Sequence, residues 1–231
     1  MGKHKPHLQV QTHKLWSHTE KAFTQNRHSV LDLSRMLISN SKVRGNGLSD
    51  DQKSVLRDLR REAIYDLGNS NTGYSRIDVL KAYFDLFDEI FFFGSLGGHG
   101  RCEMGVRCRK TGEVTLGGTT ETLYKNDRLI RQLTGTKRLR LLITVYVMKS
   151  EERRSRYCAL LEYCGTLLHE MIHAFLQCWA CDYDGCSDAK DRLGQAHGPM
   201  CRCLERNLLS SSKLSRDFRF QRCHISKDFK D

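Results

Sequence analysis

The stretch of the sequence that decides the fold is LLHEMIHAFL, residues 167–176. Its apolar residues predict a buried helix. Residues four apart lie on the same face of a helix, so the imidazoles of His169 and His173 can bind one ion. Zinc accepts imidazole nitrogen, and a catalytic zinc site keeps one position open for water. Glu170 lies too far round the helix to complete this pair of ligands, but it can take a proton from that water.

The spacing of these three residues is specific. With 10 His and 11 Glu in 231 residues, independent placement gives about 0.02 matches to this pattern. The alternative is a pair of core histidines with a surface glutamate between them. We therefore predict Zn²⁺ as the cofactor, His169 and His173 as two of its ligands, and Glu170 as the catalytic base.

A third metal ligand is needed, and the sequence offers several. His197 lies 24 residues beyond His173 and is followed by Gly198 and Pro199, which predicts a loop. A ligand from a loop suits a site whose first two ligands share one helix, so we predict His197. The competing candidates are Glu205, on the next expected helix, and His224, near the end of the chain.

The cysteines after this helix are a second candidate for metal binding. They are Cys178, Cys181, Cys186, Cys201 and Cys203. Cysteine is the favoured ligand of structural zinc, but the strong signal of two CxxC pairs is missing. A second metal site and ordinary thiols both remain open from the sequence.

The order of the expected elements is that of an α+β domain. Helices are predicted over residues 49–67 and 75–92, and the second has Ile77 on its apolar face with Leu80, Phe84, Phe87 and Phe91. Short strands are predicted over 103–109, 113–116 and 139–148. Helices follow over 156–178 and 198–209. We expect helices packed on a short, mainly antiparallel sheet.

The chain divides into three expected parts. Residues 1–48 are basic and His-rich, with little periodicity, which predicts a flexible extension. Residues 49–209 form the domain. Residues 210–231 are a Ser-rich, charged tail, in which Phe218–Phe220 can add an edge strand.

Composition narrows the function class. We find no apolar stretch near 18 residues, so we expect no membrane span, and the N-terminus does not resemble a secretory signal. We therefore expect an intracellular protein. The net charge is +11, which favours a polyanion such as DNA as a partner. Residues 101–154 carry 13 Lys/Arg against 6 Asp/Glu, whereas residues 151–200 carry 5 against 8.

The motifs resemble those of a known family. The HEMIHAF segment, residues 169–175, followed by HGP at 197–199, resembles the SprT-like domain of the Spartan proteases. Upstream, residues 84–96, FDLFDEIFFFGSL, are similar to the family's first helix and the FF-x-G-x-L phrase that ends it. The resemblance covers residues 75–209. The loop between His173 and His197 is longer than in Spartan, and no paired-cysteine zinc ribbon follows.

The resemblance implies a small zincin-like metalloprotease that cuts DNA-associated or DNA-crosslinked proteins. It assigns zinc binding to His169, His173 and His197 and water activation to Glu170, with basic surface holding DNA and the nucleus as the expected location. Two other hypotheses stay open: a non-catalytic DNA-binding module with a structural zinc, and a general zinc peptidase that does not depend on DNA. The sequence leaves the oligomeric state undetermined.

Overall fold

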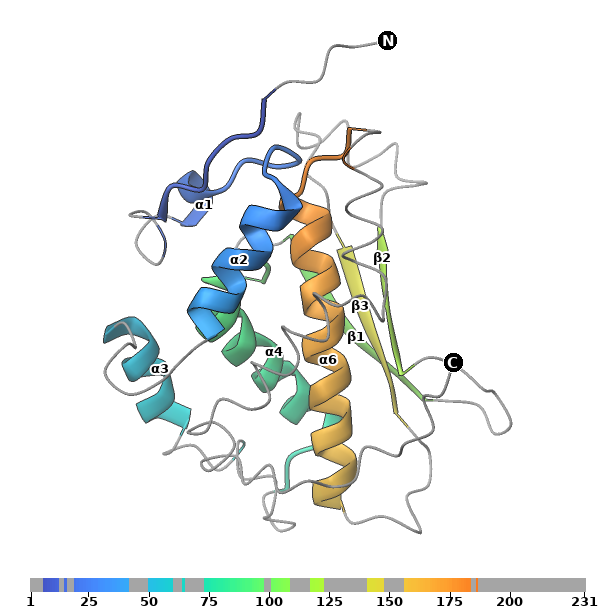
Figure 1. Ribbon diagram of the computed structural model, residues 1–231. Coiled ribbons are helices and arrows are strands. Elements are labelled where there is room, and N and C mark those ends of the chain that lie inside the picture. The colour runs from blue at the N-terminus through green and yellow to red at the C-terminus, as the bar shows by residue number, and fades with distance from the viewer. Residues whose placement is uncertain are drawn as a thin grey trace, which may run out of the picture.

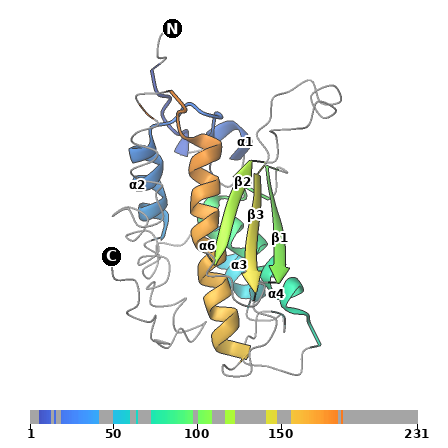
Figure 2. The ribbon, with the colours of Figure 1, turned by 90° about the vertical axis from the view of Figure 1, so that its right-hand side faces the viewer.

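The described helices lie on one side of a small sheet (Figures 1 and 2). The computed structural model describes residues 6–12, 15, 19–41, 50–59, 64, 73–97, 101–108, 117–122, 141–147, 156–183 and 186. Its elements are α1 (Thr19–Ala22), α2 (Val30–Ser41), α3 (Asp50–Leu59), α4 (Arg76–Phe92), β1 (Cys102–Cys108), β2 (Gly118–Thr122), β3 (Leu141–Val147) and α6 (Arg156–Trp179). The mixture of helices and strands is that of the expected α+β class.

The described sheet is mixed, which corrects the expectation of a mainly antiparallel one. Its strand order is β1-β3-β2, with β3 in the centre. β1 pairs with β3 in parallel, and β2 pairs with β3 in the antiparallel sense. The reason is topological. β2 runs opposite to both other strands, so β1 and β3 run the same way, and they pair because β3 lies between β1 and β2 in the sheet.

β2 is made of residues that lie outside the predicted strands. Its sequence is GTTET, residues 118–122, whereas the strand expected over 113–116 lies outside the described residues. Threonine is a good strand former because of its branched β-carbon. The hydrophobic pattern does not predict the strand, because no large apolar side chains alternate along it.

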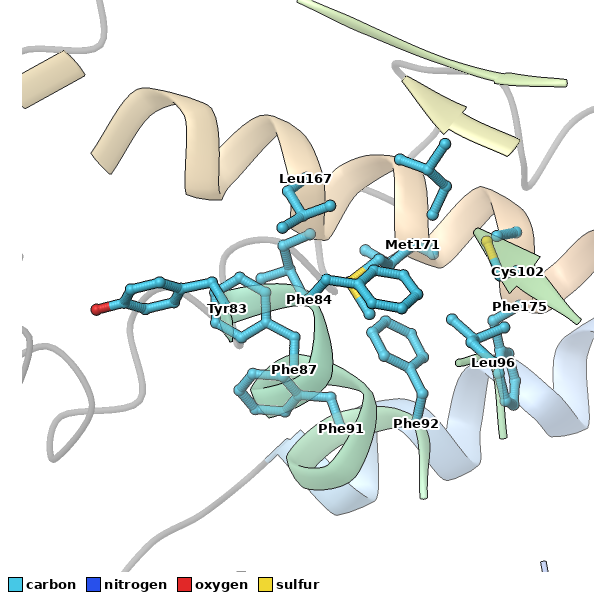
Figure 3. Close-up of a cluster of buried hydrophobic side chains, with 14 of the residues drawn as sticks. Tyr83, Phe84, Phe87, Phe91, Phe92, Leu96, Cys102, Leu167, Met171 and Phe175 are labelled. Atoms are coloured by element: carbon cyan, nitrogen blue, oxygen red, sulfur yellow. The ribbon is translucent and has the colours of Figure 1, made fainter. Parts of the chain in front are cut away.

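The core lies between α4, α6 and the sheet (Figure 3). Phe84, Phe87 and Phe92 of α4 meet Leu167 and Met171 of α6 there, and all five side chains are buried. β3 adds Leu141, Ile143, Val145 and Val147, whose period of two places them on the same face of the strand. The expected aromatic stripe of α4 is therefore core, except that Ile77 at its N-terminal end is 45% exposed.

Part of the segment over residues 1–48, for which we expect a flexible extension, packs against the other described elements. Phe23 and Leu33 belong to the same core as α4 and α6, and Phe23 stacks on Trp179 at a ring-centroid distance of 5.1 Å. Asn40 of α2 donates hydrogen bonds to the carbonyls of Ile90 and Phe91, at 3.2 and 3.3 Å. These contacts satisfy carbonyl groups that the end of α4 leaves without helical partners.

α3 makes a similar contact with the end of α4. Gln52 is buried, and its Nε2 donates to the Ile90 carbonyl at 3.0 Å and to Asn40 Oδ1 at 3.3 Å. The side chains of α2 and α3 therefore meet at one helix end. The helix expected over residues 49–67 is confirmed over Asp50–Leu59. Of the rest of that range the structure describes only residue 64, which is not part of this helix.

α4 begins and ends as its sequence predicts. Ser75 Oγ accepts a hydrogen bond from the Asp78 backbone N–H, and Asp78 Oδ2 accepts one from the Ser75 N–H, each at 3.2 Å. This reciprocal pair is a capping box. The Ser75 hydroxyl also donates to Asp78 Oδ2 at 2.6 Å, and this bond, together with the one from the Ser75 N–H, lowers the pKa of the exposed Asp78 carboxyl. The helix ends at Phe93, whose φ of 63° is left-handed, and Gly94 follows with φ of 67°.

Asp88 holds the turn that follows α4. Its carboxylate is 2% exposed and accepts hydrogen bonds from the backbone N–H of Leu96 at 3.0 Å and of Gly97 at 2.7 Å. A Cβ at Gly97 would lie 2.7 Å from Phe84 Cε1, so only glycine fits there. The FF-x-G-x-L phrase of the sequence thus encodes a tight turn pinned by a buried carboxylate.

No helix among the described residues is long and apolar enough to cross a membrane.

We predict that Asp88→Asn destabilises the fold by about 1–3 kcal/mol, because an amide replaces a buried charged acceptor of two backbone N–H groups. Urea unfolding of the full chain measures the loss. Asp85→Asn is the matched control, since Asp85 lies exposed on the same helix. Equal stability of the two variants would contradict the role given to Asp88.

Candidate functional site

The candidate site lies on the middle of α6. Thr166, His169, Glu170 and His173 occupy one side of that helix, within an arc of about 100° at 3.6 residues per turn. Thr166, His169 and His173 are half-buried, and Glu170 is 8% exposed. The opposite side of α6 carries Leu167, Met171 and other core residues, so packing fixes the direction in which the polar side points.

The two histidines converge as the sequence predicts. His169 Nε2 and His173 Nε2 are 3.0 Å apart, and the ring centroids are 4.7 Å apart with the planes nearly perpendicular. Two nitrogens bound at about 2.05 Å to one tetrahedral zinc would be about 3.3 Å apart. The pair needs to open by only a few tenths of an ångström to hold the ion, so these donors fit zinc.

Glu170 is held by β2. The hydroxyl of Thr120 lies 2.7 Å from Glu170 Oε2, to which it can donate, and 3.1 Å from the Glu170 main-chain carbonyl. Burial raises the pKa of the Glu170 carboxyl, whereas the Thr120 hydrogen bond and the charge of His169 lower it. Its burial makes Glu170 a stronger base than an exposed carboxylate, and Thr120 fixes its orientation.

Two glycines let β2 approach α6 closely enough for this contact. A Cβ at Gly118 would lie 2.8 Å from Glu170 Cγ, 2.9 Å from Thr166 Cγ2 and 3.1 Å from the Thr144 carbonyl oxygen. At Gly117 a Cβ would lie 3.0 Å from Thr166 Oγ1. The pair Gly117-Gly118 therefore sets the distance between the strand and the base.

The sequence did not predict a role in the site for Thr120, Gly117 or Gly118. Their role depends on a strand and a helix that are about 50 residues apart in the chain, and Thr120 and Glu170 are separated by 50 positions. The sequence signal that could have been used is weak: a Gly-Gly pair followed by two threonines, upstream of the motif helix.

His197, the predicted third ligand, lies outside the described residues, as do its competitors Glu205 and His224. The carboxylate of Glu170 does not close the site in their place. It forms no group with the two imidazoles in which all ligand atoms lie within 4.8 Å of one another. This separation agrees with a base beside the metal rather than a ligand on it.

The cysteines divide into two kinds. Cys178 lies in the core with Cys102 and Cys164, and burial raises the pKa of the Cys102 and Cys164 thiols. Cys181 and Cys186 lie close together, with His7 beside them, in a group that could hold a metal. Cys201 and Cys203 lie outside the described residues.

We predict that Gly118→Ala destabilises the protein by about 1–3 kcal/mol, because the added methyl group meets the Thr144 backbone as well as side chains. Urea unfolding is the measurement. Gly105→Ala on β1 is the control, since the nearest atom to its new Cβ would be 3.5 Å away. A Gly118→Ala variant as stable as the control would mean that β2 does not press on Glu170.

Comparison with known proteins gave no relative. No family model, no curated protein and no solved structure matches the chain. The candidate site therefore stands on its own residues: two imidazoles that converge on α6, a buried carboxylate between them in sequence, and a strand hydroxyl bonded to that carboxylate.

Proposed function

We propose that the chain is a zinc-dependent endopeptidase of the SprT-like type, with a zincin-like fold. The observation that carries the proposal is the convergence of His169 Nε2 and His173 Nε2, 3.0 Å apart, next to the buried base Glu170. His197 is proposed as the third ligand from the sequence and the family resemblance. A site of three protein ligands leaves one zinc position for water, as catalysis requires.

The proposed mechanism divides the work between the ion and the chain. Zinc, when bound, would polarise the scissile carbonyl and lower the pKa of water towards about 7. Glu170 takes the proton of the attacking water on its carboxylate and then gives it to the leaving amine. Thr120 keeps the carboxylate in one orientation throughout, because its hydroxyl is bonded to Oε2. Thr120 is thus a positioning residue.

The buried carboxylate argues against a purely structural metal. A charge removed from water costs free energy unless the protein compensates for it, and Glu170 is 8% exposed. In a non-catalytic zinc module this cost would serve no purpose. In a hydrolase the same burial raises the pKa of the group and makes it a better proton acceptor.

The proposed substrates are proteins bound or crosslinked to DNA. This part of the proposal rests on the family resemblance and on the net charge of +11. Lys and Arg side chains that neutralise phosphates release counterions, so DNA-stimulated activity should fall steeply as salt rises. A nuclear location is part of the same proposal.

We predict that Glu170→Gln keeps zinc and loses about 10²–10⁴-fold in turnover, because the amide cannot accept the proton. The measurement is cleavage of a DNA-binding protein by the full chain, with metal content determined in parallel. Glu162→Gln is the control, since Glu162 is exposed on the same helix. His169→Ala should lose activity together with the zinc of the α6 site.

The same assay with and without DNA separates the hypotheses. Stimulation by DNA that fades with salt supports the proposed substrates, whereas activity that ignores DNA identifies a general peptidase. If Glu170→Gln cleaves the substrate at the wild-type rate, the proposed mechanism is wrong. No cleavage by a zinc-loaded wild-type chain under any of these conditions would leave the DNA-binding module as the better reading.

We predict that Thr120→Val moves the acidic limb of the kcat/KM profile to higher pH. The Thr120 hydrogen bond lowers the pKa of Glu170, so its loss raises that pKa. Because the base works deprotonated, activity then disappears at a higher pH than in the wild type. The expected change lies in kcat rather than in KM, and pH–rate profiles from about pH 5 to 9 measure it.

Thr119→Val on the same strand is the matched control. The Thr119 hydroxyl is buried and has no hydrogen-bond partner among the described residues, so its removal should leave the profile in place. If both variants shift the acidic limb equally, the effect comes from the strand as a whole and not from the bond to Glu170.

A further inference from the structure

Three potential metal ligands from the two ends of the described chain lie close together just after the C-terminal end of α6. The ligand atoms of His7, Cys181 and Cys186 all lie within 4.8 Å of one another. His7 Nε2 is 3.1 Å from Cys186 Sγ, although the two residues are 179 positions apart. Among the described residues, no other group of three or more such ligands is as close.

The backbone brings His7 to this place independently of the ligands themselves. The Leu8 N–H donates to the Arg27 carbonyl at 2.8 Å, and Arg27 in turn donates from its guanidinium to the Pro6 carbonyl at 3.2 Å. Residues 6–8 are therefore bonded to the loop between α1 and α2. That loop is bonded in turn to the end of α6, since the His28 N–H donates to Trp179 O at 3.1 Å and the Cys181 N–H to His28 O at 2.8 Å.

His28 joins the three segments. It is 1% exposed; its Nε2 accepts from the Thr24 N–H at 2.8 Å, which leaves Nδ1 to donate to the Leu8 carbonyl at 2.7 Å. Burial lowers the pKa of this imidazole, so the neutral form that this pattern needs is the favoured one. His28 is thus a structural residue that fixes the position of its neighbour in space, His7.

Cys186 is brought back towards Cys181 by a turn. The Cys186 N–H donates to the Tyr183 carbonyl at 2.6 Å. The start of the turn is tied to the same loop, because Asn26 Nδ2 donates to Asp182 Oδ2 at 2.8 Å. Cys181 is buried and Cys186 half-buried, and the two are not joined in a disulfide.

We propose that His7, Cys181 and Cys186 bind a second zinc ion, separate from the proposed catalytic one. Thiolate and imidazole are the ligands of structural zinc. At bond lengths of about 2.3 Å for sulfur and 2.05 Å for nitrogen, tetrahedral ligands lie roughly 3.5–3.8 Å apart. The observed group lies within 4.8 Å, and His7 Nε2 and Cys186 Sγ, 3.1 Å apart, would have to separate by a few tenths of an ångström to reach this geometry. Binding releases the two thiol protons to solvent.

The ion would crosslink two segments that are far apart in the chain. It would connect the N-terminal segment to the residues directly after α6, the helix that carries His169, Glu170 and His173. Closing so long a loop removes much of the freedom of the unfolded chain, and the gain grows with loop length. The proposal does not depend on the proposed function, since a chain without protease activity could carry the same crosslink.

Cobalt distinguishes this site from the one on the middle of α6. Co²⁺ bound by thiolates gives an intense sulfur-to-metal charge-transfer band, and a site built from imidazoles has no sulfur to give one. The metal-free full chain, kept reduced, should bind Co²⁺ with this band. Cys181→Ser with Cys186→Ser should abolish the band and lower the bound metal by one equivalent, whereas His169→Ala should keep the band.

Two further variants guard against misfolding and non-specific thiol binding. His7 is exposed, so His7→Ala should fold and keep its circular dichroism spectrum while its Co²⁺ affinity falls by about tenfold or more. Cys108→Ser is the control, because Cys108 is an exposed thiol on β1 outside the group. It should leave the band unchanged.

The proposal is overturned by either of two results. One is a wild-type chain that shows no thiolate band at saturating Co²⁺. The other is a band that survives the double serine variant or that disappears equally in Cys108→Ser. Loss of the α6 site in His169→Ala with the band intact would support the second site whatever the outcome of the protease assays.

Discussion

The burial of α6 is the constraint on which the rest of the structure depends. One side of the helix packs against α4 through Leu167, Met171 and Phe175, and β2 closes on the adjacent side. A helix held in this way cannot rotate without moving apolar side chains into water or into other atoms, and packed interiors resist both. The direction of His169, Glu170 and His173 is therefore set by residues that have no part in the chemistry.

How much of this could be predicted depends on the range of the interactions. The extents of α4, β3 and α6 follow from local periodicity, and the capping box at Ser75 marks the start of α4 within one residue. The convergence of His169 and His173 was predictable for the same reason, because helix geometry relates positions four apart. β2 was not predictable in this way, since the roles of its glycines and threonines depend on their contacts with α6.

The N-terminal segment illustrates the same limit. The helix α2 has apolar residues such as Leu33, but neither these nor Phe23 show in the sequence which surface will cover them. They are buried because the end of α6 and the end of α4 supply surfaces that the sequence of the segment does not contain. The meeting of His7 with Cys186 is equally non-local. The cysteine spacing suggested a metal site, but no pattern in the sequence connected it to a histidine 179 residues away.

The ionisation of Glu170, the proposed base, depends on the charge at the proposed metal site. Burial alone pushes this carboxyl towards its protonated form, in which it cannot accept a proton. The Thr120 hydrogen bond acts in the opposite direction, and a dication held by the neighbouring imidazoles would act more strongly in that direction because opposite charges within a few ångströms favour ionisation. Metal binding and base ionisation would then be coupled. Filling the site would lower the pKa of Glu170, so the bound ion would favour the ionised form in which this carboxylate accepts a proton.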